Sequence, residues 1–307
     1  MCVNGDGSRL ESMGTVLVDS QKEARYEKVK SVKSWLKSVR LCFFLFDMVK
    51  FIIACFKLRR KNLEKRLNSN HLKIIAIIAM TIDHVADLFY PSFPAQPFPI
   101  MLHIIGRLTA PIMWFFIAEG YHYTHNIKKY LLRLGIFAIV SHFAYCFAFG
   151  MKFVPFETDI FNQTSVMYPL FIAVLVLWLQ DTEFKYKILK HILIFVLVWS
   201  AFPADWSCIA VLAILGIYRN RGNLKKQTII MMLWVLLYAV VSFFFVNKIY
   251  GIVELFVILV YPFMKQYNGQ RGKAKWLKWF FYIYYPAHLV VIGIIRIAMY
   301  GDVSILF

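Results

Sequence analysis

Residues 226–246 read KQTIIMMLWVLLYAVVSFFFV, and after Lys226 this stretch contains no charged residue. A bilayer core about 30 Å thick is crossed by about 20 helical residues, because each residue of an α-helix rises about 1.5 Å. The stretch is therefore long and apolar enough to cross a membrane as a single helix.

Eight further apolar stretches flank this one, each bounded by charged or turn residues. The full set predicts an all-α integral membrane protein, a polytopic bundle of about nine transmembrane helices, with eight to ten as the range. The fifth, sixth and eighth stretches are short, and we expect them to be thin or partly re-entrant. The nine are 72–90, 99–119, 129–149, 164–180, 187–201, 204–218, 226–246, 249–264 and 276–297.

Lys and Arg alternate between the connecting segments. The segments 57–73, 120–133, 181–190, 219–226 and 265–278 carry 22 of them, whereas the intervening segments carry only Lys152 and Lys248. Since basic loops stay in the cytoplasm, this distribution places the amino terminus inside and the carboxyl terminus outside, in a plasma or inner membrane that we expect to be bacterial.

The overall composition points to the lipid bilayer as the main partner. Of the 307 residues, 60% are hydrophobic, and the formal net charge is +18. The basic residues fall in short clusters between apolar runs instead of forming one patch, so we expect no nucleic-acid partner. The five cysteines show no paired spacing and are expected to be reduced.

Three regions follow from these patterns. Residues 71–307 form the transmembrane domain. Residues 41–70 combine an amphipathic helix at 41–56, which we expect on the inner leaflet, with a basic linker. Residues 1–40 are polar and basic. They are expected to be either disordered or mis-started, with Met13 or Met48 as the true initiator in the second case.

Ionisable residues inside apolar helices are expensive, so each is a functional candidate. Lys73 and His84 are eleven residues apart, almost a whole number of turns, and should share one face about 16 Å apart along the helix. His84 suits proton transfer near neutral pH, with a buried packing histidine as the alternative. Asp83 is expected to face a neighbouring helix instead of His84, whereas Asp87 lies one turn above it.

Arg107 in the second stretch must face a carboxylate, a cavity or an anionic group. An ion pair with Asp83 or Asp87 and a role in substrate binding are both open. Glu119, His122 and His125 have the i, i+3, i+6 spacing of metal ligands, yet a polar cap at the interface is favoured, and we predict no metal.

The last stretch contains His288 at the depth of His84, which predicts a cavity shared by the two histidines. Pro286 is expected to kink this helix and to free backbone carbonyls for the cavity. Tyr285 lies too deep for an interfacial aromatic belt and is expected to line the cavity.

Four segments together resemble the TraX family of conjugal-transfer membrane proteins. They are LKIIAIIAMTIDH (72–84), GRLTAPIMWFFIAEGY (106–121), THNIKKYLLRL (124–134) and YPAHL (285–289). The resemblance extends from residue 71 to about 297, is most specific over 106–133, and excludes the first seventy residues.

The resemblance implies N-terminal acetylation of pilin, and a distant similarity to membrane acyltransferases that use cytoplasmic acyl-coenzyme A. Those enzymes carry a basic residue, ten intervening residues and a histidine in their first span, which Lys73 and His84 match. Lys73 replaces the usual arginine and loses bidentate phosphate recognition. The implied function is acetyl transfer from acetyl-coenzyme A (acetyl-CoA) to an exported pilin amino terminus, peptide or glycan.

The resemblance also implies roles for individual residues. His84 would be a base or acyl relay, helped by His288, with Asp83 and Asp205 orienting or polarising and Arg107 stabilising an oxyanion. Contacts with the substrates are expected from Lys73, Arg107, Glu119, Tyr121, Arg133, Asn162 and Tyr285. The alternative is a polytopic protein without catalysis, either a transporter or a component of conjugation or pilus assembly.

Overall fold

The structure is a computed structural model that describes residues 67–91, 93–154, 162–274 and 276–301. The chain divides into two compact units, 1–61 and 62–307, and the described residues all belong to the second. The segment 1–40 and the amphipathic helix predicted at 41–56 lie outside the described residues.

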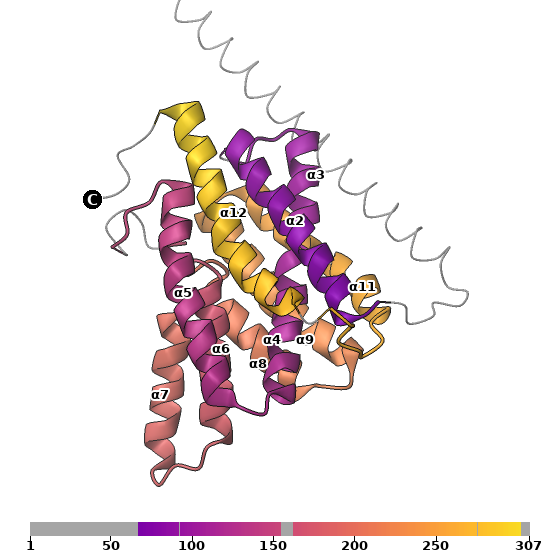
Figure 1. The fold of residues 1–307 in the computed structure, drawn as a ribbon, viewed down its shortest axis with the longest axis vertical. Helices are drawn as coiled ribbons and strands as arrows, with labels where there is room; N and C mark the ends of the chain where they lie inside the picture. Colours follow the sequence, from indigo (N-terminus) through magenta and orange to yellow (C-terminus); the bar gives the residue numbers. More distant parts are fainter. Residues whose placement is uncertain (1–66, 92, 155–161, 275, 302–307) are drawn as a thin grey trace, which may run out of the picture. The chain divides into compact units, whose positions relative to one another are not determined.

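The described chain is helical, without β-strands and with two isolated bridges between single residues (Figure 1). All nine predicted stretches are helical there, which confirms the all-α class. The elements are α2 (Ser69–Phe89), α3 (Pro97–Gly106), α4 (Thr109–Tyr123), α5 (Ile127–Phe149), α6 (Met167–Asp181), α7 (Lys187–Ser200), α8 (Ser207–Arg219), α9 (Leu224–Phe245), α10 (Lys248–Glu254), the 3₁₀ helix η1 (Leu255–Val260), α11 (Tyr261–Lys265) and α12 (Leu277–Tyr300).

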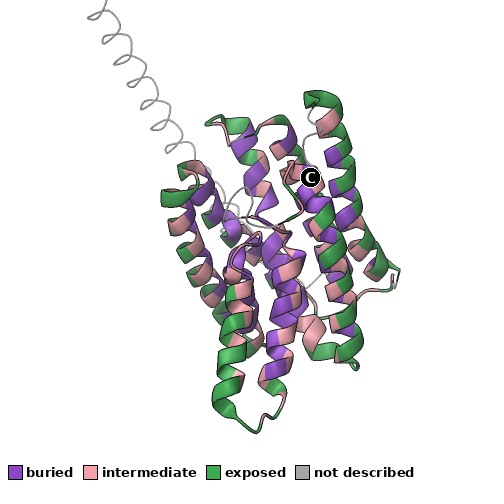
Figure 2. Cartoon of the chain, turned by 90° about the vertical axis from the view of Figure 1, so that its left-hand side faces the viewer, coloured by how far each residue is buried: buried purple, intermediate pink, exposed green. Residues whose placement is uncertain are grey.

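Four of these helical stretches are long and apolar enough to cross a membrane. They are Pro97–Tyr123, which α3 and α4 form together, Ile127–Phe149, Leu224–Phe245 and Leu277–Tyr300. Many of their apolar side chains are exposed, and α7 has no buried residue at all (Figure 2). Apolar surface of this extent is typical of helices that face lipid.

Two of the nine stretches are interrupted. The second divides into α3 and α4 at Arg107 and Leu108, four residues before Pro111. Proline has no N–H to donate to the carbonyl four residues earlier, and its ring clashes with that carbonyl. The eighth divides into α10, η1 and α11 just before Pro262, whereas Pro286 lies within a continuous α12.

Connecting segments that were predicted on the same side of the membrane contact one another. Among the basic segments, the Leu67 N–H donates to the Gln266 carbonyl at 3.0 Å, and Arg221 pairs with Glu119 at 2.8 Å. Among the others, the Asp205 N–H donates to the Thr164 carbonyl at 2.9 Å. Segments that the charge pattern assigned to one side therefore meet in the described part of the chain.

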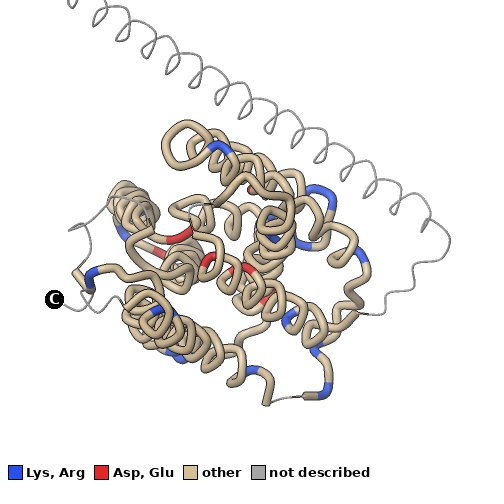
Figure 3. Tube along the Cα trace, turned by 90° about the horizontal axis from the view of Figure 1, so that it is seen from above, with Lys and Arg blue, Asp and Glu red and all other residues tan. Residues whose placement is uncertain are grey.

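Helix α12 packs against both α5 and α2, and Figure 1 shows it between them. Viewed from above, acidic positions gather among the helices, which is the first indication of a buried polar site (Figure 3).

The packing of α10 against α9 depends on Gly251. A Cβ there would lie 2.6 Å from the Ala239 carbonyl oxygen and 2.6 Å from the Phe243 backbone nitrogen. Because backbone cannot move aside cheaply, Gly251→Ala should cost about 1–3 kcal/mol and lower the melting temperature in detergent. Gly135→Ala is the control, since its Cβ would meet only the Phe171 ring at 3.4 Å. Equal melting temperatures for the two variants would contradict this packing.

Candidate functional site

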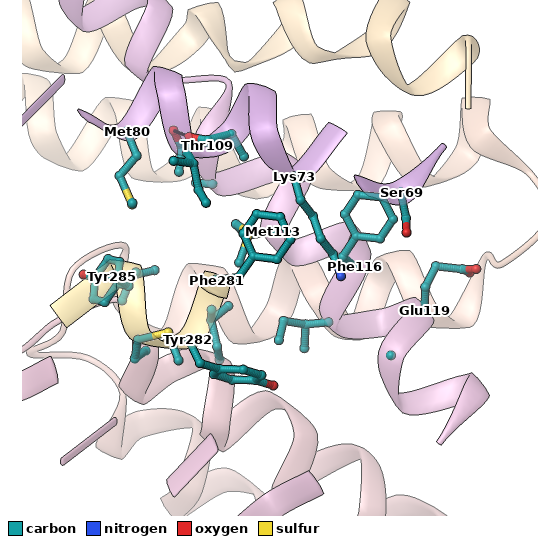
Figure 4. Close-up of a pocket in the computed structure, with 18 of the residues that line it drawn as sticks. Ser69, Lys73, Met80, Thr109, Met113, Phe116, Glu119, Phe281, Tyr282 and Tyr285 are labelled. Atoms are coloured by element: carbon teal, nitrogen blue, oxygen red, sulfur yellow. Dashed lines mark hydrogen bonds between the residues drawn. The ribbon is translucent and has the colours of Figure 1, made fainter. Parts of the chain in front are cut away.

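A cavity of about 570 Å³ lies between α2, α4, α5, α6 and α12. Figure 4 shows Ser69 and Glu119 towards one end, Met80 and Tyr285 towards the other, and Lys73 between Phe116 and Phe281. Lys73 and His84 both line it, as their spacing along α2 predicted. The cavity thus connects the end of the bundle where the basic segments meet with the polar residues deep inside.

His84 and His288 contact each other at the deep end. The His84 Nδ1 lies 2.8 Å from the His288 Nε2, and the two rings are nearly parallel, with centroids 5.1 Å apart. His84 lines the cavity, whereas His288 lies behind it and is stacked on the Tyr284 ring. The two histidines thus lie at one depth, but the predicted shared cavity is lined by His84 alone of the two.

The backbone determines which nitrogen of His84 is free. His288 Nδ1 lies 3.0 Å from the Tyr284 carbonyl oxygen, which can only accept, so Nδ1 carries the hydrogen. With both rings neutral, the His288 Nε2 then accepts from the His84 Nδ1–H. His84 Nε2 is left with its lone pair, and within the described residues it makes no hydrogen bond. In this tautomer the Nε2 lone pair of His84 is not used by any described protein group.

Arg107 occupies the break between α3 and α4 and joins three helices. Its guanidinium is 2.9 Å from the Asp83 Oδ2 and 2.7 Å from the Glu254 Oε1, and its Nε donates to the His103 carbonyl at 3.3 Å. Asp83 also accepts from His103 Nδ1 at 2.8 Å. Of the two alternatives for Arg107, the structure has the ion pair, and its donors are committed to protein groups.

Asp83, Asp87 and His103 offer ligand atoms that all lie within 4.8 Å of one another. Both oxygens of Asp83 are already bound by Arg107 and His103. The His103 Nε2 is 3.9 Å from the Asp87 Oδ1 and has no hydrogen-bond partner in the described chain. These bonds make the group an ion-pair network, with only His103 Nε2 and Asp87 left for a further ligand.

Basic side chains surround the other end of the cavity. Lys73, Arg133, Arg271 and Lys278 all line it there. Lys73 lies over the Phe116 and Phe281 rings at 5.0 and 5.5 Å, and the Arg133 guanidinium lies over Tyr130 and Tyr282. The walls of this end therefore combine positive charge with aromatic surface.

Comparison with known proteins identifies the family. Residues 68–296 match the family described as TraX protein. The chain belongs to the TraX family. It is 32% identical over 230 residues to a probable fimbrial assembly protein FimC of Dichelobacter nodosus, covering 72% of this chain and 92% of that protein. It is also 24% identical over 134 residues to an uncharacterized protein of Rickettsia prowazekii (strain Madrid E), covering 42% and 45% respectively. No solved structure matches the chain.

The match confirms the resemblance and nearly the same boundaries. Segment 106–121 of the TraX region contributes Gly106, on which a Cβ would overlap the Asp83 side chain. The absence of a side chain at Gly106 lets Asp83 approach α3 closely enough to reach Arg107 and His103. Two of the quoted TraX segments, 72–84 and 106–121, are thus held together by buried hydrogen bonds.

Most of the predicted site residues of this TraX protein line the cavity. They are His84, Asp83, Asp205, Lys73, Arg107, Glu119, Arg133 and Tyr285. Glu119 is nevertheless paired with Arg221, which is the polar cap that was favoured over a metal site. His122 and His125 do not join it at the cavity.

Three predicted residues of the site do not line the cavity. His288 lies behind His84 and contacts it, and the other two lie elsewhere. Tyr121 points away from the cavity, donates to the Asp181 Oδ2 at 2.5 Å and packs against Tyr218. Asn162 lies in the loop before α6 with a φ of 53° and does not line the cavity. Neither side chain is placed to contact a ligand in this cavity. The predictions were wrong because closeness in sequence to the family segments does not determine the direction of a side chain.

Sequence reasoning missed Arg271 and Lys278, which were counted only as topological charges of the segment 265–278. Their closeness in sequence to the YPAHL segment was the available signal. That closeness does not show which lysines and arginines of the loop face inward. Sequence reasoning also assigned no role to His103 or Glu254. Both accept hydrogen bonds from Arg107, His103 through its backbone carbonyl and Glu254 through its carboxylate.

The buried network predicts that removing Arg107 lowers the stability of the protein much more than removing the exposed Arg221. Arg107→Met leaves two buried carboxylates without their partner and should destabilise by about 3–5 kcal/mol. Arg221→Met breaks the more exposed pair with Glu119 and should cost at most about 1 kcal/mol. Thermal unfolding of both proteins in detergent measures the difference, and similar melting temperatures would contradict the network.

Proposed function

We propose that this chain is a membrane acetyltransferase that moves an acetyl group from cytoplasmic acetyl-CoA to an exported acceptor. The observation that carries the proposal is one cavity that reaches from a basic end to His84, whose Nε2 makes no hydrogen bond within the described residues. A phosphate-bearing donor and a general base are the two requirements of such a transfer, and this cavity offers groups suited to each.

Acetyl-CoA supplies a thioester whose carbonyl carbon accepts an amine or a hydroxyl. His84 Nε2 takes the proton from the acceptor atom as that atom bonds to the carbonyl carbon. The carbon–sulfur bond then breaks, and His84 returns the proton to the departing thiolate sulfur. A neutral amine or a hydroxyl thereby yields an amide or an ester and free coenzyme A, and His84 ends as it began.

His288 acts on the reaction through His84. It accepts the Nδ1 hydrogen, so it holds the ring in one tautomer and one orientation. Asp205 also lines the cavity and can orient the acceptor. Arg107 and Asp83 bind each other instead of the reacting atoms. The oxyanion role predicted for Arg107 therefore forms no step of this mechanism.

The membrane arrangement that fits this function has about nine spans with the amino terminus in the cytoplasm. The pairwise contacts of the basic segments support it, because they bring the positive loops together around the basic end of the cavity, here called the donor end, where the acetyl donor would bind. The bacterial inner membrane is the corresponding location.

The acceptor is inferred from the relatives. The Dichelobacter nodosus relative is described as a probable fimbrial assembly protein. Together with the pilin acetylation that the TraX family implies, this favours a pilin amino terminus, with another exported peptide or a glycan fitting the same chemistry.

The second candidate function is assembly of a pilus or fimbria without catalysis, which the name of that relative favours. An assembly component needs no coenzyme. Binding of acetyl-CoA by the purified protein therefore separates the two functions.

The test is acetyl transfer from radiolabelled acetyl-CoA into the acid-insoluble fraction of membranes that contain the protein at matched levels. His84→Ala should lower the rate by about 10²- to 10⁴-fold, because a general base contributes that much. Lys73→Ala should raise the acetyl-CoA concentration needed for half-maximal rate. His191→Ala is the control, since His191 is exposed on α7 and bonds only to the Lys187 carbonyl. Unchanged acetyl transfer in both His84→Ala and Lys73→Ala would contradict the roles assigned to His84 and Lys73.

A further inference from the structure

The segment between α11 and α12 is fastened to the start of α2. The Ser69 N–H donates to the Gln270 carbonyl at 2.8 Å, and the Ser69 hydroxyl donates to the Arg271 carbonyl at 2.7 Å. The Asn68 and Asn70 side chains continue this seam, since the Cβ of an alanine at Gly272 would lie 2.7 Å from the Asn70 amide nitrogen. The backbone of Arg271 is therefore held in place beside the donor end of the cavity.

This seam places Arg271 beside other positive charges that line the cavity. Arg271 and Lys278 lie near enough to Lys73 for the three charges to repel one another, and Arg133 lies near enough to Lys278 for the same effect. Within the described residues no ion pair neutralises any of the four. The Arg133 Nε is buried and also lacks a hydrogen-bond partner there.

Holding four cations together costs energy that an anion would recover. Glu119 is the carboxylate that lines this end of the cavity, and it is already paired with Arg221 at 2.8 Å. Helices α2 and α12 also begin here, at Ser69 and Leu277, so their amino-terminal dipoles add to the positive potential. The arrangement suits a ligand that carries several negative charges.

We propose that Arg271 and Lys278, with Lys73 and Arg133, form a phosphate clamp that binds the several phosphate groups of a nucleotide-bearing acyl donor. The proposal rests on the proposed function for the identity of the donor and assigns its recognition to the 266–278 segment. The aromatic walls at Phe116, Phe281 and Tyr282 would then lie along the uncharged arm of the donor. A phospholipid headgroup offers the same chemistry and is separated below.

The experiment measures binding of coenzyme A to the full chain in neutral detergent by calorimetry. Arg271→Ala with Lys278→Ala should weaken coenzyme A binding by roughly 10- to 100-fold, since charge-assisted hydrogen bonds to phosphate are lost. Pantetheine, which has the same arm without the nucleotide and its phosphates, should bind equally to both proteins. Binding of coenzyme A to the wild type should also weaken as salt rises.

Lys273→Ala is the matched control, because Lys273 is an exposed cation of the same segment that does not line the cavity. It should leave coenzyme A binding within about twofold, because its charge lies outside the cavity that Arg271 and Lys278 line. An equal loss in Lys273→Ala and Arg271→Ala would overturn the clamp. So would coenzyme A binding that ignores the double substitution, or displacement of bound coenzyme A by short-chain phosphatidylglycerol at equimolar concentration.

Failure of the clamp and failure of the proposed function give different results. If coenzyme A binding depends on the phosphates but His84→Ala does not change acetyl transfer, the clamp is supported and the transferase mechanism is rejected. Transfer that requires His84 but ignores Arg271 and Lys278 would reject the clamp alone.

Discussion

A guanidinium inside an apolar helix bundle has to be matched by negative charge, and Arg107 is matched by Asp83 on α2 and Glu254 on α10. Its burial makes this requirement strict, since Arg107 is 5% exposed and Glu254 is fully buried. The break before Pro111 places Arg107 at a helix end, and Gly106 lets Asp83 come close. The three helices are thus held in one relative position.

That position decides where the reactive group lies. Asp83 turns towards α3, so the next residue, His84, is rotated by about 100° into the cavity and towards α12. There His288, tied to its own backbone, sets the tautomer of His84. The ion-paired residue and the proposed base are therefore adjacent in sequence, Asp83 joining α2 to α3 and His84 facing the cavity.

Helix number and boundaries were accessible from the sequence, because each follows from apolar length and from where the charges fall. The common face of Lys73 and His84 and the common depth of His84 and His288 were accessible for the same reason, since helical rise and rotation are regular. Partners across helices were not. The Glu254 contact with Arg107, the outward direction of Tyr121 and the fastening of Arg271 to Ser69 depend on how separate segments pack, which helical periodicity does not encode.

Acetyl transfer by this mechanism requires that the unprotonated Nε2 of His84 be reachable in the cavity. Diethyl pyrocarbonate modifies unprotonated imidazole nitrogens, and mass spectrometry of the digested protein locates each adduct. We expect modification of His84 that acetyl-CoA suppresses, no modification of His288 behind it, and modification of the exposed His191 with or without acetyl-CoA. Modification of His288 with an unreactive His84, or a His84 adduct that acetyl-CoA leaves unchanged, would contradict the account.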